Sequence, residues 1–179
     1  MSTTYTLGYS FGSGVTIPGT GILLDNQMNN FAYQYGNPEV ISRFASIGNK
    51  FEPGKRPMST MTPIMMFDDN KALKLISGSP GGALIPAAVL RVITGLIDFN
   101  LNLGEATMLP RLHKDWPFES LRMERGFSQD TQKILTSYGH QVELSKTMGS
   151  TQSILISSRG REGFADLRRP NAGVAIQID

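Results

Sequence analysis

The hexapeptide Ser77-Gly78-Ser79-Pro80-Gly81-Gly82 constrains the fold of this chain most strongly. It follows a short apolar run, Leu73 to Ile76, and precedes a long apolar segment, Ala83 to Asp98. This order predicts a strand, a glycine-rich turn and a buried helix. Glycines at a helix start leave backbone N–H groups open to an anion, either a phosphate or the oxyanion of a carbonyl under attack. A tight turn with no ligand is equally compatible with the pattern.

The composition is typical of one domain with a real core, spanning residues 1–179, because 40% of the 179 residues are hydrophobic. The net charge is only +2 and no basic run is present, so we expect no nucleic-acid partner. The chain has no cysteine, which excludes disulfides and thiolate zinc sites. No apolar run is long enough to span a bilayer. We expect no cofactor and no metal.

The remaining pattern predicts short strands and two further helices. An antiparallel hairpin, Ile64–Phe67 with Leu73–Ile76, delivers the chain to the glycine turn. A capping box at Asn102–Glu105 starts a short helix, and Ser128 caps a helix over Gln129–Tyr138. The segment Tyr33–Glu52 has no clear period and is interpreted as a loop. The other predicted strands are Thr4–Tyr9, Gly19–Asp25 (buried, after a turn), Gln141–Leu144, Ser153–Ser157, Gly163–Ala165 and Ala172–Ile178.

Two polar clusters are candidates for binding. Four amide side chains between Asn26 and Asn30 form either a solvated loop or the wall of a polar pocket. Ser59, Thr60 and Thr62 are either strand-entry residues or a hydroxyl cluster facing a ligand.

Two further groups of polar residues have structural interpretations. With only one other histidine in the chain, His113 is interpreted as a loop hydrogen-bonding residue rather than a metal ligand or base. Asp166 beside Arg168 and Arg169 predicts a structural ion-pair corner.

In combination, the motifs resemble the small, C-terminal subunit of γ-glutamyltranspeptidase, in that family's order and over nearly the whole chain. The motifs that carry the resemblance are Tyr5-Thr6-Leu7, Phe11-Gly12-Ser13-Gly14, Gly21-Ile22-Leu23-Leu24-Asp25-Asn26-Gln27-Met28, Lys55-Arg56-Pro57-Met58-Ser59-Thr60-Met61-Thr62-Pro63, Gly78-Ser79-Pro80-Gly81-Gly82, Glu105-Ala106-Thr107, Pro110-Arg111-Leu112-His113 and Met148-Gly149-Ser150-Thr151-Gln152. Each motif alone is weak, whereas all of them in register are specific.

The resemblance implies an α+β fold, the four-layer αββα sandwich of Ntn-hydrolases, of which this chain would be the small-subunit part without its first strand. In that family a self-cleaving precursor exposes a threonine, whose hydroxyl forms an acyl-enzyme with a γ-glutamyl amide such as glutathione. By residue, the resemblance assigns the oxyanion hole to Gly81 and Gly82 and support of the nucleophile to Thr6. It assigns substrate binding to Gln27, Asn30, Ser59 and Thr60, with the large subunit as partner.

Three departures from the family pattern affect the expected activity. The nucleophilic threonine lies upstream of the position matched by Thr4, so we expect the chain as given to be inactive. Asn30 stands where the family has an aspartate that pairs with the substrate ammonium, which is closer to a cephalosporin-acylase branch of the family. Gly8 replaces an asparagine near the substrate. The large subunit, which supplies an arginine to the substrate carboxylate, is not in this chain.

Two rival interpretations remain at this point: a non-catalytic remnant that binds a partner, and a phosphate-binding domain using residues 77–82. The second is weaker because the glycine loop lacks the Lys-Ser/Thr ending of a P-loop. The absent first strand predicts self-association through a sheet edge at Ser2–Tyr9. The resemblance implies a periplasmic or extracellular location for a full-length bacterial precursor, while the chain itself leaves the compartment open.

Overall fold

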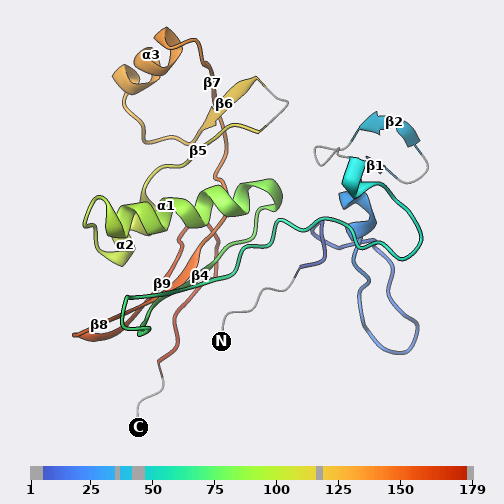
Figure 1. Ribbon diagram of the computed structural model, residues 1–179, viewed down its shortest axis with the longest axis horizontal. Coiled ribbons are helices and arrows are strands. Elements are labelled where there is room, and N and C mark those ends of the chain that lie inside the picture. Colours follow the sequence, from blue (N-terminus) through green and yellow to red (C-terminus); the bar gives the residue numbers. More distant parts are fainter. Residues whose placement is uncertain (1–5, 35–36, 42–46, 116–118, 177–179) are drawn as a thin grey trace. The chain divides into compact units, whose positions relative to one another are not determined.

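The computed structural model describes residues 6–34, 37–41, 47–115 and 119–176, which fall into two compact units. The first unit ends at Thr60 and the second begins at Met61. Figure 1 gives the course of the chain and the labels of its elements. The mixture of helices with mainly antiparallel sheets confirms the predicted α+β class.

The second unit is built on a four-stranded antiparallel sheet in the order β3-β4-β8-β9. Two helices, α1 and α2, pack on one face of this sheet (Figure 1). The hairpin and both of these helices were predicted, including the capping box of α2. The bounds are β3 (Ile64–Phe67), β4 (Leu73–Gly78), η3 (Gly82–Leu84), α1 (Ile85–Ile97), α2 (Leu103–Met108), β8 (Gln152–Ser157) and β9 (Gly160–Ala165).

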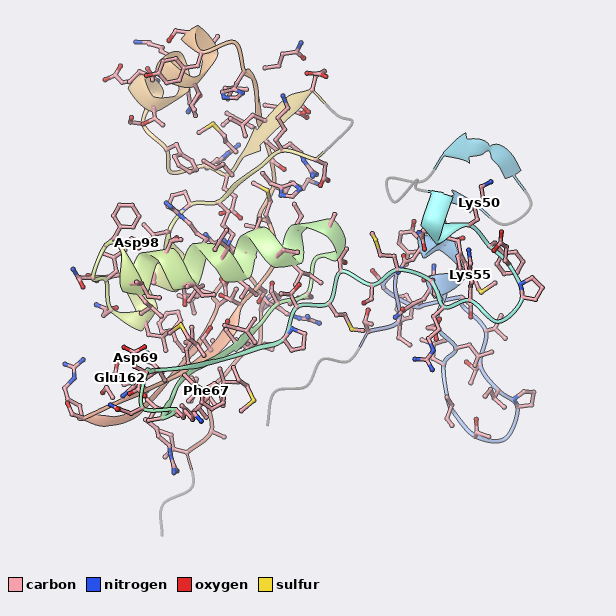
Figure 2. All side chains as sticks on the ribbon, in the orientation of Figure 1. Lys50, Lys55, Phe67, Asp69, Asp98 and Glu162 are labelled. Carbon is pink, nitrogen blue, oxygen red and sulfur yellow. The ribbon has the colours of Figure 1, made fainter. Side chains whose placement is uncertain are left out.

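Strand alternation gives the sheet two faces of different character. Ile64, Met66 and Leu75 face the helices and join a core that includes Val92 of α1. The intervening residues lie on the opposite face and are exposed in this chain: Met65 by 42%, Phe67 by 54% and Ile154 by 43%. Figure 2 shows the side chain of Phe67 on the side of the sheet away from α1. Much of this apolar face is therefore uncovered by the described residues, although Val174 lies against Gly163 of β9.

A second, three-stranded sheet follows α2 in the chain. Its strands pair in the order β5-β6-β7, with β5 antiparallel and β7 parallel to β6. The strands β5 and β6 were not predicted, whereas β7 and the capped helix α3 were. The bounds are β5 (Leu112–His113), β6 (Ser120–Met123), α3 (Gln129–Ser137) and β7 (Gln141–Leu144).

The first unit contains short elements around a small aromatic centre. Phe31 is buried, and its ring meets that of Phe51 edge-on with the centroids 5.2 Å apart. The elements are η1 (Gln27–Asn30), β1 (Tyr33–Gln34), β2 (Asn37–Ile41) and η2 (Ile47–Asn49). The predicted loop at Tyr33–Glu52 is thus wrong in part, because β1 and β2 pair with each other. Residues 35–36 and 42–46 of that segment lie outside the described residues.

Three other predicted strands are not found in the described residues. Residues 6–9 form a bend held by side chains, and residues 4–5 lie outside the description. Gly19–Asp25 is not a buried strand, because it returns on residues 15–17 in an exposed loop with a single bridge, Thr16 to Leu23. Residues 172–176 are irregular, and 177–178 lie outside the description. The sheet edge predicted at Ser2–Tyr9 is therefore not formed by residues 6–9.

Candidate active site

The glycine turn lies between β4 and α1 of the second unit, as predicted. Gly81 has φ +141° and Gly82 has φ +59°, backbone conformations that side-chain-bearing residues rarely adopt. Both glycines are exposed, and the N–H groups of Gly81 and Gly82 make no hydrogen bond to any described residue. Two adjacent open amides at the start of a helix form a suitable site for a developing negative charge.

The loop Met148–Gln152 packs against this turn and hydrogen-bonds to it. The N–H of Ser150 donates to Ser79 Oγ at 3.0 Å, and Ser79 Oγ donates to the carbonyl oxygen of Pro80 at 2.8 Å. Gly149 has φ +68°, and a Cβ there would lie 2.8 Å from Ser79 Oγ. A Cβ on Gly81 would lie 3.5 Å from the Cα of Gly149. The conformation of the turn therefore depends on the absence of a side chain at Gly149.

The supporting loop is in turn held by a buried ionic network. Asp166 is fully buried and pairs with Arg111 at 2.7 Å, while Glu124 pairs with Arg168 at 2.8 Å. The guanidinium of Arg111 donates to the carbonyl oxygen of Met148 at 2.6 Å, and Glu124 accepts the N–H of Met148. The ion-pair corner predicted at residues 166–169 is confirmed for Asp166 with Arg168, while Arg111 and Glu124 are partners that the sequence did not reveal.

Burial and hydrogen bonding set the charges of this network. Burial opposes ionisation of Asp166, but the N–H of Arg168 and the Arg111 guanidinium together hold its pKa below the ordinary value. Burial lowers the pKa of Arg111. For Arg168, burial is outweighed by hydrogen bonding to Glu124, and the pKa is raised. The network therefore holds the carboxylate of Asp166 and the guanidinium groups of Arg111 and Arg168 in their charged forms at neutral pH.

The first unit gathers the other residues singled out from the sequence. Thr6 Oγ1 accepts the N–H of Gly8 at 3.2 Å, and the N–H of Tyr9 donates to Asn26 Oδ1 at 3.1 Å. Gly8 has φ +89°, and a Cβ there would lie 2.0 Å from Asn26 Oδ1. The amide of Asn26 thus lies where a side chain at Gly8 would begin. This places Thr6 close in space to the segment that contains Gln27.

Asn49 connects the amide cluster to the hydroxyl cluster. Its Nδ2 donates to the carbonyl oxygen of Asn30 at 2.6 Å, and its Oδ1 accepts the N–H of Met58 at 3.1 Å. Asn49 is buried, Gln27 and Asn30 are half-buried, and Ser59 is exposed directly after Met58. Asn49, which sequence reasoning missed, therefore joins Asn30 to Met58, the residue before Ser59. Asn49 lay in a stretch interpreted as a loop, with no motif to mark it.

The histidine considered as a possible ligand has a local partner. His113 Nε2 lies 2.6 Å from Asp115 Oδ1, and Arg122 contacts the same carboxylate at 3.2 Å. This agrees with the interpretation of His113 as a hydrogen-bonding residue. Within the ranges that the structure describes, no group of three or more His, Cys, Asp or Glu side chains is arranged to hold a metal ion.

Comparison with known proteins identifies the family. The sequence profile of the Gamma-glutamyltranspeptidase family matches residues 1–176. A relative from Escherichia coli K12, a "Glutathione hydrolase proenzyme", is 43% identical over 160 residues, which are 89% of this chain and 27% of the relative. The chain spans about a quarter to a third of the length of such relatives. The fold and these matches define an Ntn-hydrolase-type protein, and the chain belongs to the γ-glutamyltranspeptidase family.

Solved structures support the same conclusion. A γ-glutamyltranspeptidase mutant from Helicobacter pylori superposes with a TM-score of 0.84 at 37% identity, covering 94% of this chain and 93% of the matched one. A cephalosporin acylase from Bacillus halodurans superposes with a TM-score of 0.78 at 27% identity, covering 94% of this chain and 30% of that one. No helix among the described residues is both long and apolar enough to cross a bilayer.

Proposed function

We propose that this chain is the small-subunit part of an enzyme that transfers or hydrolyses the γ-glutamyl group of glutathione-like amides. In this proposal residues 1–179 form a single domain of an αββα sandwich. A threonine that precedes the chain in the full-length protein attacks the amide carbonyl, and its hydroxyl proton passes to its own α-amine. The C–N bond breaks, the amine leaves with that proton, and water or an amino acid then cleaves the acyl ester.

The observation that carries the proposal is the open glycine turn. In the proposed reaction the N–H groups of Gly81 and Gly82 donate to the carbonyl oxygen as it becomes an oxyanion. Their left-handed backbone, their exposure and their lack of hydrogen-bond partners among the described residues suit that role. A phosphate-binding loop would also need a lysine at the end of the turn, and this chain has Ala83 and Leu84 there.

The polar side of the first unit is the proposed binding site for the acyl group. Ser59 and Thr60 would donate to the substrate α-carboxylate, and Gln27 and Asn30 would contact its α-amino group. Thr6 would hydrogen-bond the nucleophile. The support for this grouping is the hydrogen bonding of Asn49, which joins the carbonyl of Asn30 to the residue preceding Ser59.

The uncovered sheet face supports a large-subunit partner. Met65, Phe67 and Ile154 leave an apolar face that a second sheet would cover in a four-layer sandwich. The matched Helicobacter pylori chain is about as long as this one, whereas the Escherichia coli relative is several times longer and is named a proenzyme. We infer that the remainder of the precursor supplies the covering layer.

Hydrolysis by the purified full-length protein tests the proposed function. We expect release of p-nitroaniline from γ-glutamyl-p-nitroanilide and a stimulation of that release by an acceptor dipeptide. Substitution Asn30→Asp should raise kcat/KM for this substrate about tenfold, because a charged partner for the ammonium replaces a neutral amide. The absence of turnover in protein with an intact upstream threonine would support the non-catalytic alternative.

A cephalosporin-acylase-like activity is the second candidate, favoured by Asn30 and Gly8. Both residues reduce the polar contacts expected for an α-ammonium, and the Bacillus halodurans acylase shares the fold. Glutaryl-p-nitroanilide lacks the ammonium and separates the two candidates. A higher kcat/KM for the glutaryl than for the γ-glutamyl substrate, with no gain for the glutaryl substrate in Asn30→Asp, would favour the acylase.

A further inference from the structure

Ser79 lies directly before the Pro80–Gly81 peptide of the glycine turn, and its side chain is buried. The N–H of Ser150 donates to Ser79 Oγ at 3.0 Å, and Ser79 Oγ lies 2.8 Å from the carbonyl oxygen of Pro80. An N–H can only donate and a carbonyl oxygen can only accept. The hydroxyl hydrogen of Ser79 therefore points at the Pro80 oxygen.

The peptide bond couples the carbonyl of Pro80 rigidly to the N–H of Gly81. In a trans peptide these two groups lie in one plane and point in opposite directions. A peptide bond that does not precede a proline is almost always trans. The hydrogen bond that fixes the Pro80 oxygen therefore also fixes the direction of the Gly81 N–H, which is one of the two donors of the proposed oxyanion hole.

The covalent structure of the turn permits the opposite orientation of this peptide. A flip of the peptide plane changes ψ of Pro80, which the proline ring leaves free, and φ of Gly81. It would take φ of Gly81 from +141° to a negative value, and glycine adopts both. In the part of the chain that the structure describes, the Pro80 oxygen accepts from Ser79 alone and the Gly81 N–H makes no hydrogen bond. Ser79 is therefore the group that selects the orientation.

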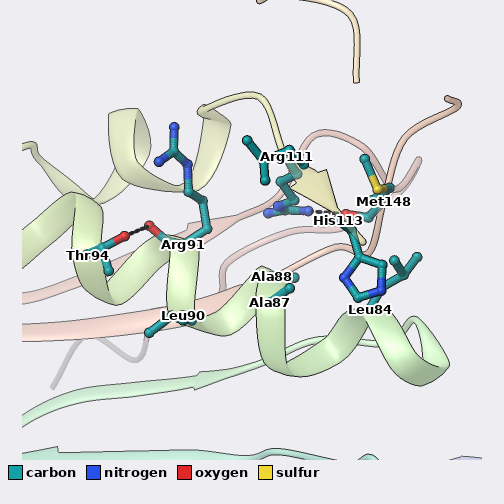
Figure 3. A pocket seen from close by; sticks show the side chains of 10 residues that line it. Leu84, Ala87, Ala88, Leu90, Arg91, Thr94, Arg111, His113 and Met148 are labelled. Carbon is teal, nitrogen blue, oxygen red and sulfur yellow. Dashed lines mark hydrogen bonds between the residues drawn. The ribbon is translucent and has the colours of Figure 1, made fainter. Parts of the chain in front are cut away.

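The loop that carries Ser150 is itself fixed on both sides of this residue. The guanidinium of Arg111 donates to the carbonyl oxygen of Met148 at 2.6 Å (Figure 3), and the N–H of Thr151 donates to Asp166 Oδ2 at 3.0 Å. Ser150 is buried, as are Arg111 and Asp166. The hydrogen bond from Ser150 to the glycine turn therefore starts from a fixed point that is shielded from water.

We propose that Ser79 is a positioning residue for the oxyanion hole. Its hydroxyl holds the Pro80–Gly81 peptide so that the Gly81 N–H, and not the Pro80 oxygen, faces the substrate carbonyl. Donation to the Pro80 oxygen also polarises the peptide, which makes the Gly81 N–H a stronger donor. The consequence for catalysis rests on the proposed acyl transfer, whereas the orientation of the peptide does not.

Steady-state kinetics of the full-length protein with γ-glutamyl-p-nitroanilide test the consequence for catalysis. Ser79→Ala removes both hydrogen bonds of the hydroxyl. We expect kcat to fall by about tenfold or more and KM to change by less than about twofold, because the oxyanion forms only in the transition state. A role in folding alone would not produce this split between kcat and KM.

The matched control is Ser77→Ala. Ser77 is a buried serine of β4, and its hydroxyl lies 2.8 Å from that of Ser153 on β8. This variant also removes a buried hydroxyl hydrogen bond close to the turn, so thermal unfolding should show a similar loss of stability, while kcat should not change. An equal fall in kcat in Ser77→Ala and Ser79→Ala would overturn the proposal.

Ser79→Cys is a second variant, which retains a weak donor and acceptor at the same position. Its kcat should lie between those of Ser79→Ala and the unsubstituted protein. A kcat no higher than that of Ser79→Ala would show that packing, not hydrogen bonding, is what the serine supplies.

Crystal structures of the full-length protein test the orientation of the peptide without any turnover. We expect one orientation of the Pro80–Gly81 peptide in the unsubstituted protein, and a flipped or mixed orientation in Ser79→Ala. A single, unchanged orientation in Ser79→Ala would overturn the proposal. Absence of turnover by the unsubstituted protein would instead contradict the proposed function, and the two crystal structures would still decide whether Ser79 holds the peptide.

Discussion

Asn49 is a buried amide whose side chain joins two segments of the first unit. Replacing it with alanine removes the hydrogen bonds to the carbonyl of Asn30 and from the N–H of Met58. If these segments carry the substrate contacts, Asn49→Ala should raise KM for γ-glutamyl-p-nitroanilide about tenfold and change kcat less, because it loosens binding groups away from the oxyanion turn. Steady-state kinetics of the full-length protein measure this split.

The matched control for Asn49 is Asn70→Ala. Asn70 lies in the exposed turn between β3 and β4, and its one hydrogen bond to a described residue is from its backbone N–H to Asp68 Oδ1. This variant should leave both kinetic constants unchanged. Equal KM values for Asn49→Ala and the control would show that the amide only fills space.

Asp166 couples the stability of the second unit to acid pH. Its pKa is lowered in the folded state, so its ionised form favours folding at every pH above its ordinary pKa of 3.8. That contribution is lost as the pH falls from about 4 through the lower, folded-state pKa. We expect the free energy of unfolding to decline over this acid range and not between pH 5 and 7 on account of this group.

Substitution Asp166→Asn tests this assignment. It leaves two buried guanidinium groups with one carboxylate, so we expect a loss of about 3–5 kcal/mol at pH 7. Its stability should also vary less with pH below 4 than that of the unsubstituted protein. Denaturant unfolding at several pH values gives both quantities, with the exposed Asp130→Asn as control. Parallel pH profiles for Asp166→Asn and the unsubstituted protein would contradict the assignment.

At the scale of elements, the contact between the loop Met148–Gln152 and the glycine turn determines the geometry of the proposed oxyanion hole. In Gly149→Ala the new Cβ would approach Ser79 Oγ and the Cβ of Ala88, at 2.8 and 3.2 Å. We expect the turn to shift, with a fall in kcat of ten- to a hundredfold and a stability loss of about 2 kcal/mol. Kinetics and thermal unfolding of the full-length protein measure the two effects.

Gly139→Ala is the control that separates backbone strain from this clash. Gly139 also has a left-handed backbone, with φ +90°, but a Cβ there would meet no atom within 4 Å. It should lower stability by about 1 kcal/mol and leave kcat unchanged. A similar fall in kcat in both variants would mean that the contact behind the turn has no part in catalysis.

The elements that could be predicted carry their signals locally. The hairpin before the glycine turn has alternating apolar residues and a polar turn, and α2 and α3 have cap residues that the structure uses. In contrast, β5 has two residues, Leu112 and His113, and exists only through pairing with Met123 and Arg122. Gly19–Asp25 was misassigned because Ile22 and Leu24 are apolar but exposed in this chain.

In the candidate site, too, one part is marked by a local sequence motif and the rest depends on contacts between residues far apart in the sequence. The glycine turn is a local motif, so its position and its open amides could be predicted. The bond from Ser150 to Ser79 spans 71 residues, and Arg111 meets Asp166 across 55. No local pattern reports such contacts. Asn49 belongs to the same class, since its partners lie 19 and 9 residues away.

At the scale of the whole molecule, we expect the exposed apolar face of the four-stranded sheet to determine how the chain associates. Expressed alone, the chain should self-associate through this face, because Met65, Phe67 and Ile154 expose apolar side chains on it. Ile154→Lys should reduce the oligomers with a change in stability of about 0.5 kcal/mol or less. Light scattering over a range of concentrations measures the association.

Leu144→Lys is the control for the sheet face, since Leu144 is at least as exposed as Ile154 but lies on β7 of the other sheet. It should leave the association unchanged. In the full-length protein, Ile154→Lys should also weaken the binding between this chain and the rest of the precursor. If the isolated chain is a monodisperse monomer at all concentrations, the prediction that it self-associates through this sheet face is wrong.

The central claim is that a threonine upstream of this chain carries a γ-glutamyl group during turnover. Its most direct test is the intact mass of the full-length protein, quenched in acid during the hydrolysis of γ-glutamyl-p-nitroanilide. We expect the species that contains this chain to gain the mass of one glutamyl residue, with peptide mapping placing it on a threonine before residue 1. Turnover with no such adduct, or an adduct on a side chain within residues 1–179, would contradict the account.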